Sequence, residues 1–164
     1  MPHSLVRVIK QSKPFRSLEQ EVNLSIHRAS AQLLEPFAQF LKTAAKLTVS
    51  QYNMLRILRG AHPSRLPSSE ISNRMVTRDP DITRLVDRLG DRGLVDRERN
   101  PRDRRVVEVG ITKEGLAVLK KLDDSVEEYP KTALGHLGPE RLEQLCTLLD
   151  AIITTPITFP KPKK

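Results

Sequence analysis

Apolar residues recur every three or four positions along most of this 164-residue chain, which is the spacing of one buried face of an α-helix. The first such run starts after Ser17, a suitable helix N-cap, and continues to residue 46 with Pro36 inside it. Because proline lacks an amide hydrogen, we expect Pro36 to kink this helix or to split it in two. Thr48 opens a second helical run, which ends at Gly60.

Two shorter helical runs follow a loop at residues 62–65. Residues 68–75 predict a short helix. Asp79 and Pro80 form an N-cap and first-turn pair, which predicts a further helix over residues 79–92. Its core stripe is expected to contain Ile82, Leu85, Val86 and Leu89.

After Gly93 the pattern changes from helical to extended. Residues 94–99 and 106–111 are two short strand candidates with turn-forming residues between them, so they predict a β-hairpin. Thr112 is expected to cap a long helix. A break at residues 135–139 then precedes a last helical run that contains Leu142, Leu145, Leu149 and Ile152.

The order helix, short helix, helix and hairpin is that of a winged helix-turn-helix. We therefore predict a mainly α fold with a small β-hairpin wing, flanked by N- and C-terminal helices. Five parts are expected: a basic arm (1–16), a helix (17–46), the winged helix-turn-helix (47–112), C-terminal helices (113–155) and a basic tail (156–164).

The charge of the chain indicates a polyanionic partner, either nucleic acid or an anionic membrane surface. There are 28 basic and 20 acidic residues, a formal net charge of +8, but seven of the basic residues lie in the two terminal arms. The more informative feature is an arginine-rich centre, residues 56–113, with a net charge of +5 between helical flanks whose charges sum to −4. This contrast places the expected DNA contact on residues 78–105.

The helix predicted at 79–92 has the size to enter the major groove of DNA, where its first residues would meet base edges. Arg84 suits guanine, Thr83 suits a thymine methyl group or a phosphate, and Asp81 suits cytosine. The alternative is that Arg84, Asp87, Arg88 and Asp91 form a solvated face of intrahelical ion pairs.

The predicted hairpin is crowded with cations: Arg97, Arg99, Arg102, Arg104 and Arg105. An arginine at the tip of a hairpin suits a narrow minor groove, where the potential is most negative. Asp103 is expected to orient a neighbouring guanidinium by a charge-assisted hydrogen bond. The alternative is an ordinary charged hairpin.

Three segments together resemble the multiple-antibiotic-resistance regulator (MarR) family. These are Leu47–Tyr52, then Ile82–Leu89 with Arg92–Val95, and the wing pattern D-x-R-x5-(L/I)-T-x-x-G at Asp103, Arg105, Ile111, Thr112 and Gly115. In element order the resemblance covers about residues 18–155.

The resemblance implies a winged-helix transcription regulator, a repressor that acts as a homodimer on a pseudo-palindromic operator in double-stranded DNA. The terminal helices would interlace in the dimer, and a small aromatic or lipophilic effector would release the DNA. Residues 68–75 would form the support helix and 79–92 the recognition helix. The candidate DNA-binding residues are Ser68, Arg78, Asp81, Thr83, Arg84, Arg88, Arg102, Asp103, Arg104 and Arg105.

The sequence gives little support for a disulfide, a metal site or a cofactor site. The chain has one cysteine, Cys146, and four scattered histidines, so we expect neither a disulfide nor a metal site nor a cofactor. Cys146 lies in line with Leu142 and Leu149, which indicates packing more than redox sensing.

We also expect no enzymatic activity, because nucleophile, zinc and phosphate-loop motifs are missing. No apolar run is long enough to span a membrane and no signal peptide is evident, so the expected location is the cytoplasm. A second hypothesis keeps the fold but makes it a protein-interaction module for an acidic partner. A palindromic DNA preference would separate the two.

Overall fold

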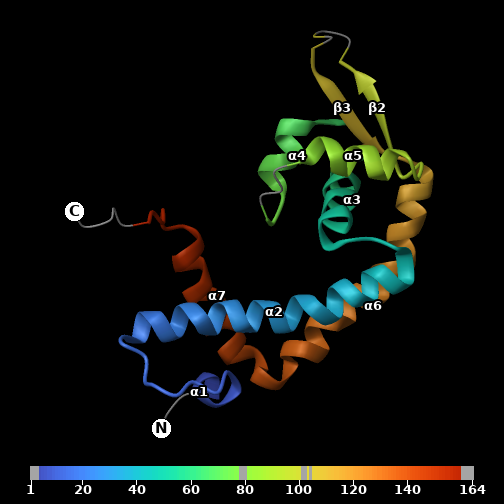
Figure 1. Ribbon diagram of the computed structural model, residues 1–164. Helices are drawn as coiled ribbons and strands as arrows, with labels where there is room; N and C mark the ends of the chain where they lie inside the picture. Colours follow the sequence, from blue (N-terminus) through green and yellow to red (C-terminus); the bar gives the residue numbers. More distant parts are fainter. Residues whose placement is uncertain (1–3, 78–80, 101–102, 104, 160–164) are drawn as a thin grey trace. The chain divides into compact units, whose positions relative to one another are not determined.

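The computed structural model describes residues 4–77, 81–100, 103 and 105–159 (Figure 1). It is mainly helical with a small antiparallel sheet, which confirms the predicted fold class. In chain order the elements are α1 (Ser4–Val8), α2 (Leu18–Ala45), α3 (Val49–Ala61), β1 (Leu66–Pro67), α4 (Ser68–Arg74), α5 (Ile82–Gly90), β2 (Val95–Arg99), β3 (Val107–Ile111), α6 (Lys113–Leu134), the 3-10 helix η1 (Gly135–Leu137) and α7 (Gly138–Ile153).

By its contacts the chain divides into two units, residues 1–122 and 123–164. Within the first unit, α2 begins at the predicted N-cap, where the Ser17 hydroxyl accepts a hydrogen bond from the Gln20 amide. The helix ends at Lys46, whose left-handed backbone (φ 53°) lets its amide bond back to the last turn. It continues through Pro36 as one helix, so the predicted split does not occur. One missing amide donor does not end a helix of 28 residues, because the neighbouring residues keep their own bonds.

Helix α3 begins with a complete capping box. The Thr48 hydroxyl accepts from the Gln51 amide at 3.2 Å, and the Gln51 side chain accepts from the Thr48 amide at 3.0 Å. The helix then supplies the centre of the core, since Met54, Leu55 and Leu58 are fully buried. The core of this unit is completed by Leu41, Leu47, Ile71, Leu85, Val86, Leu89, Leu94, Val95, Val109, Ile111, Leu119 and Leu122.

Helix α5 has the predicted buried stripe, but it begins later than predicted. Its N-cap is Asp81, whose carboxylate accepts a hydrogen bond from the Arg84 amide at 2.9 Å. The predicted N-cap at Asp79 is therefore wrong. Two aspartates flank Pro80 in the sequence, and each is a suitable cap, so the sequence alone does not choose between them.

The hairpin β2–β3 lies within one residue of the predicted strands, and it projects beyond α4 and α5 (Figure 1). The sheet order is β1-β3-β2, and all pairings are antiparallel. The sequence analysis missed β1, because two residues are too few to show an alternating pattern. Pairs such as Arg97 with Val109 and Glu98 with Glu108 set the register, so successive residues of β2 face opposite sides of the sheet.

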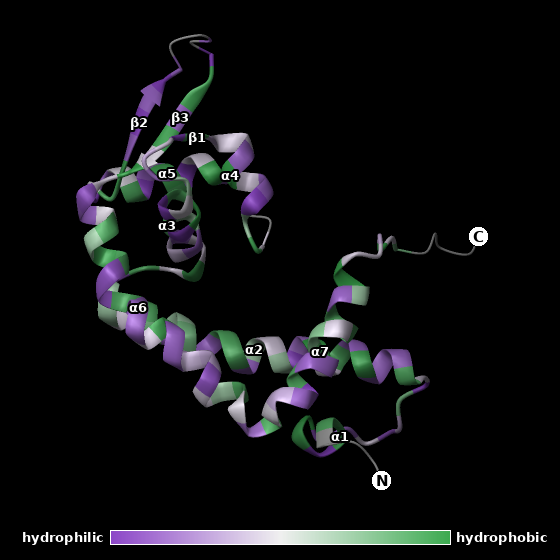
Figure 2. Ribbon diagram, turned by 180° about the vertical axis from the view of Figure 1, so that it is seen from behind, coloured by the Kyte–Doolittle hydropathy of each residue, from purple (hydrophilic) through white to green (hydrophobic). Residues whose placement is uncertain are grey.

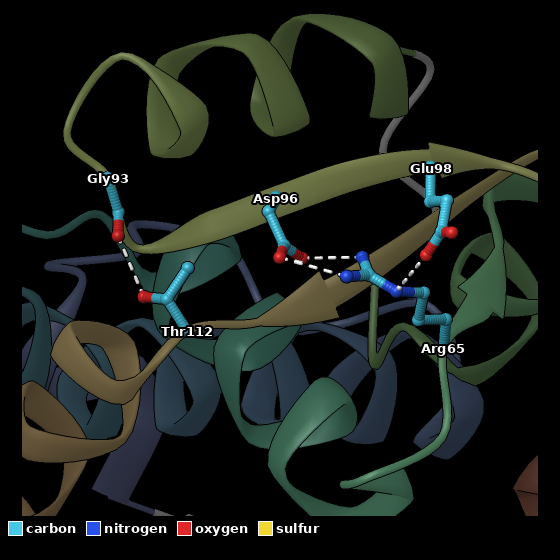
Figure 3. A network of polar contacts seen from close by, with 5 residues as sticks. All are labelled: Arg65, Gly93, Asp96, Glu98 and Thr112. Carbon is cyan, nitrogen blue, oxygen red and sulfur yellow. Dashed lines mark hydrogen bonds and ion pairs between the residues drawn. The ribbon is translucent and has the colours of Figure 1, made fainter.

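The base of the hairpin is held by the threonine and glycine of the wing pattern. The Thr112 hydroxyl donates to the Gly93 carbonyl at 2.7 Å (Figure 3). It also accepts from the Gly115 amide at 3.1 Å. A Cβ atom on Gly115 would lie 2.3 Å from the Leu94 carbonyl oxygen, so only glycine allows α6 to start this close to the strand. The pattern therefore encodes the join between the wing and α6.

Two sequence-based expectations about the ends of the chain need correction. The N-terminal arm contains the helix α1, and its Leu5 is buried. In the second unit, Cys146 of α7 is exposed, so it is not packed within the chain. None of the helices in the described ranges is long and apolar enough to cross a membrane.

No residue of α7 is buried, although the helix is rich in leucine and isoleucine. Hydrophobic residues mark α7 as they mark the helices of the first unit (Figure 2). Leu148 and Ile153 are 66% and 79% exposed. Of the predicted stripe, Leu142 and Leu149 are half-buried and Leu145 and Ile152 are exposed, so the described residues of the chain cover it only in part.

Candidate nucleic-acid interface

The exposed side of α5 carries Thr83, Arg84, Asp87 and Arg88, while Ile82, Leu85, Val86 and Leu89 face the core. Asp87 accepts a short hydrogen bond from Arg97 of β2. Among the described residues there is no ion pair within α5, so the alternative of an intrahelical network is not what the structure has. The guanidinium groups of Arg84 and Arg88 have no polar partner in the described part of the chain. As far as the structure describes the chain, α5 thus presents two arginines without a polar partner, and the charge of Asp87 is neutralised from the wing.

Asp81 has a structural task at the start of α5. Its carboxylate accepts the Arg84 amide, and a negative charge at a helix N-terminus also interacts favourably with the helix dipole. This cap fixes where Thr83 and Arg84 stand in the first turn.

The tip of the wing is shaped by side chains that bond to its backbone. The Asp103 carboxylate accepts from the Arg105 amide at 3.0 Å, and the Asn100 side chain accepts from the Asp103 amide at 3.2 Å. A short carboxylate reaches the amide two residues on in this type of turn. Within the described residues Asp103 therefore holds the turn, where the sequence analysis expected it to orient a guanidinium. Arg78, Arg102 and Arg104, also predicted to bind DNA, lie outside the described residues.

A groove of about 400 Å³ lies where α4, α5 and the wing meet. Its lining combines hydroxyl groups, two arginines and an apolar floor: Pro67, Ser68, Ser69, Thr83, Val86, Arg97, Arg105, Val106, Val107 and Val109. Three of the predicted residues, Ser68, Thr83 and Arg105, are thereby brought to one place. Ser69 was missed and Arg97 was considered only as part of the charged hairpin, because their neighbours here are distant in sequence.

On its other face the wing is tied to the loop before β1. Arg65 Nη1 and Nη2 donate to the two Asp96 carboxylate oxygens at 2.5 and 2.9 Å, and Arg65 Nε lies 3.0 Å from Glu98 Oε2 (Figure 3). These hydrogen bonds lower the pKa of Asp96 and raise the pKa of Arg65 from their ordinary values. Both groups are therefore charged over a wider pH range than when isolated.

The described residues contain no cluster of histidine, cysteine or carboxylate groups that could hold a metal ion. What they do contain is a helix whose exposed side carries Arg84 and Arg88, a hydroxyl-lined groove and a hairpin with basic side chains. This is an arrangement for contacting an anionic surface from three elements at once.

Comparison with known proteins decides the family. The model of the MarR family matches residues 47–107, which run from the residue before Thr48 into β3. The crystal structure of a MarR transcription factor from Planctomyces limnophilus is 40% identical, with a TM-score of 0.62, and the match covers 84% of this chain and 99% of that one. The chain belongs to the MarR family.

Other similar proteins match over most of the chain. The HTH-type transcriptional regulator FarR of Neisseria gonorrhoeae is 27% identical over 136 residues, which are 83% of this chain and 91% of FarR. A MarR family transcriptional regulator from Streptomyces coelicolor, solved in complex with DNA, is 25% identical with a TM-score of 0.76, covering 87% of this chain and 91% of that one. This MarR family chain is a DNA-binding transcriptional regulator and not an enzyme.

Proposed function

We propose that this MarR family regulator represses transcription as a homodimer that binds a pseudo-palindromic operator in double-stranded DNA. The observation that carries the proposal is the charge arrangement on α5. Arg84 and Arg88 have no polar partner among the described residues, while Asp87, which would repel phosphates, is paired with Arg97. Two exposed arginines beside an aspartate neutralised from the wing leave this side of α5 positively charged, which suits contact with DNA phosphates and the acceptors of guanine.

In this proposal α5 enters the major groove by its first turns. Thr83 and Arg84 stand nearest the N-terminus, which is the part of a recognition helix that reaches base edges. A guanidinium pairs with the two acceptors of guanine, so Arg84 is the residue that distinguishes one base from another. Arg88 stands one turn later and contacts a base or a phosphate. Arg78, just before α5, stays a candidate from the sequence analysis.

The groove between α4, α5 and the wing fits the DNA backbone. Ser68, Ser69 and Thr83 supply hydroxyl donors, and Arg105 supplies a cation. Contacts to phosphates set the position of a protein on the duplex without reading its sequence. Arg102 and Arg104, between β2 and β3, are proposed to enter the adjacent minor groove.

The homodimer is supported by the uncovered apolar residues of the terminal helices. In α7 these include Leu145, Leu148, Ile152 and Ile153, and in α2 they include Leu18, Val22, Ile26 and Leu34. Uncovered apolar surface of this extent marks an interaction site. A two-fold dimer would present two copies of α5 to successive turns of one DNA face, which requires a roughly palindromic operator. Release by a small aromatic or lipophilic effector is the part of the proposal that rests on family resemblance alone.

Selection of bound DNA from a random pool, followed by fluorescence anisotropy, tests the proposal. We expect a palindromic consensus, and we expect Arg84→Ala to lose about 1–3 kcal/mol of binding free energy on that consensus and to relax preference at one base position. Lys113→Ala is the matched control, because this exposed residue of α6 has the same charge and no polar partner in the described ranges.

Two outcomes would contradict the proposal. A selected pool without a palindrome would favour the alternative of a module for an acidic protein partner, since binding that depends only on salt is common to both. Equal losses from Arg84→Ala and Lys113→Ala would show that α5 does not read bases. Release by an effector is tested by a thermal-shift screen with aromatic acids. If no compound changes the thermal stability or the operator binding, that part of the proposal is contradicted.

A further inference from the structure

The two faces of the wing carry opposite charge. Because β2 alternates its side chains, Arg97 and Arg99 lie on the face turned toward α5. The other face carries the carboxylates of Asp96, Glu98 and Glu108. DNA phosphates attract the first face and repel the second. The direction in which the hairpin is held therefore decides whether the wing can approach DNA.

One arginine crosses the carboxylate face. Arg65 comes from the loop between α3 and β1, 31 positions before Asp96 in the sequence. Both terminal nitrogens donate to Asp96 and Nε is ion-paired with Glu98, so each of its three nitrogens has a carboxylate partner (Figure 3). A guanidinium held on two sides in this way keeps one orientation, and it keeps the strand in place relative to the helical core.

The space for this arginine is provided by Gly110 of β3, which pairs with Asp96 across the hairpin. A Cβ atom at position 110 would lie 2.9 Å from Asp96 Oδ1 and 3.0 Å from Arg65 Nη1. Gly110 itself has no need of glycine for its backbone angles, since its φ is not in the left-handed region. The missing side chain is what lets the ion pair lie flat on the sheet.

We infer that Arg65 is a positioning residue for DNA recognition, which makes no base contact and holds the wing with its arginine face, and not its carboxylate face, toward DNA. This inference rests on the proposed function. The hairpin is held at its base by the Thr112 bond to Gly93, and along its length by β1 and by the Arg97 bond to Asp87. On its carboxylate face it is held by the Arg65 contacts with Asp96 and Glu98. Loss of the Arg65 contacts should leave α5 in place and change only the angle at which the wing is held.

The test separates recognition of bases by α5 from recognition of the minor groove by the wing. In the selected operator, the core half-site reports on α5, and the adjoining A·T-rich flank reports on arginines in a narrow minor groove. Anisotropy is measured on operators with A·T or G·C flanks, and on operators with one changed core base. We expect Arg65→Ala to reduce the ratio of the affinities for A·T and G·C flanks about tenfold, which is the lower end of what one base pair contributes. The ratio of the affinities for the original and the changed core base should stay the same.

Gly110→Ala is the decisive companion variant, because it changes no charge. Its methyl group forces the Asp96 and Arg65 side chains to shift, so a positioning role predicts a loss of flank discrimination in the same direction as in Arg65→Ala. Circular dichroism and thermal unfolding confirm that each variant is folded. Lys113→Ala again controls for the lost positive charge, and it should weaken all operators equally.

Several results would overturn the inference. If Arg65→Ala lowers affinity for every operator by the same factor and Gly110→Ala behaves as wild type, Arg65 acts through its charge alone. If both variants keep the flank preference, the wing needs no such attachment. A wild-type protein with no flank preference contradicts the proposed role of the wing and the role of Arg65 together, whereas a preference that the variants keep contradicts only the latter.

Discussion

Helices α5 and α7 have the same helical spacing of apolar residues, but these residues are buried in α5 and none is buried in α7. In α5, Ile82, Leu85, Val86 and Leu89 recur at helical spacing and all four are buried. In α7, leucines and isoleucines recur at the same spacing and none is buried. The periodicity of a helix therefore predicts which of its faces is apolar, but it does not predict what covers that face.

The difference has a physical cause. The stripe of α5 meets α3, α4 and β2 within one compact unit, so its burial is complete in the single chain. The apolar residues of α7 are at most half-buried by the described residues of the chain. Under the proposed function the cover is a second copy of the chain, which makes the stability of α7 dependent on protein concentration and that of α5 independent of it.

The largest expected effect distinguishes the two helices directly. Leu89→Ala removes a side chain that is fully buried, and we expect a loss of about 2–5 kcal/mol in the free energy of unfolding. Leu148→Ala, at a residue that is 66% exposed, should cost within about 0.5 kcal/mol when measured on dilute monomer. Urea unfolding followed by circular dichroism measures both. Equal losses would mean that α7 is already packed in the single chain.

A second effect concerns assembly. Leu148→Asp places a charge where the proposed dimer needs an apolar contact, so we expect the dimer to dissociate at micromolar concentration while the helix content of the monomer is kept. Sedimentation velocity gives the mass of each species. A Leu148→Asp protein that stays dimeric would place the interface elsewhere, and a monomeric wild type would refute the homodimer. Lys131→Asp, at an exposed charged residue of α6, is a control in the same unit.

A smaller effect tests the task of Asp81. Loss of an N-cap costs about 1 kcal/mol, so Asp81→Ala should lower the free energy of unfolding by that amount, while Asp81→Asn should keep the cap. Thermal unfolding gives the order of the three proteins. If Asp81 also reads a base, Asp81→Asn will change the selected half-site even though stability is retained. If the half-site selected by Asp81→Asn is unchanged, the role of Asp81 is limited to capping α5.

The smallest effect is the pH dependence of the ion pair between Arg65 and Asp96. The hydrogen bonds from Arg65 lower the pKa of Asp96, so their contribution to stability is complete above the ordinary aspartate pKa of about 3.9 and is lost as pH falls through the lowered pKa. Because Asp96 is half exposed, we expect less than about 1 kcal/mol. The stability difference between wild type and Asp96→Asn should therefore shrink on acidification below pH of about 4. A constant difference would contradict the pairing.

Local interactions account for what the sequence by itself determined about this protein. The caps at Ser17 and Thr48 join residues three positions apart, and the anchor at Thr112 and Gly115 is equally short in range. The order of helices and hairpin follows from periodicity, which is why the winged-helix fold and the place of the arginine-rich centre could be predicted. Ser68, Thr83 and Arg105 were predicted one by one as residues of that centre.

Only the tertiary structure decided how those residues meet. The pairs Arg97 with Asp87 and Arg65 with Asp96 join strands to a helix and to a loop, and their partners follow from which faces pack together. The same holds for β1, which exists because β3 lies beside it, and for Cys146, whose exposure depends on what covers α7. Contacts between distant segments depend on the whole fold, and no local pattern encodes them.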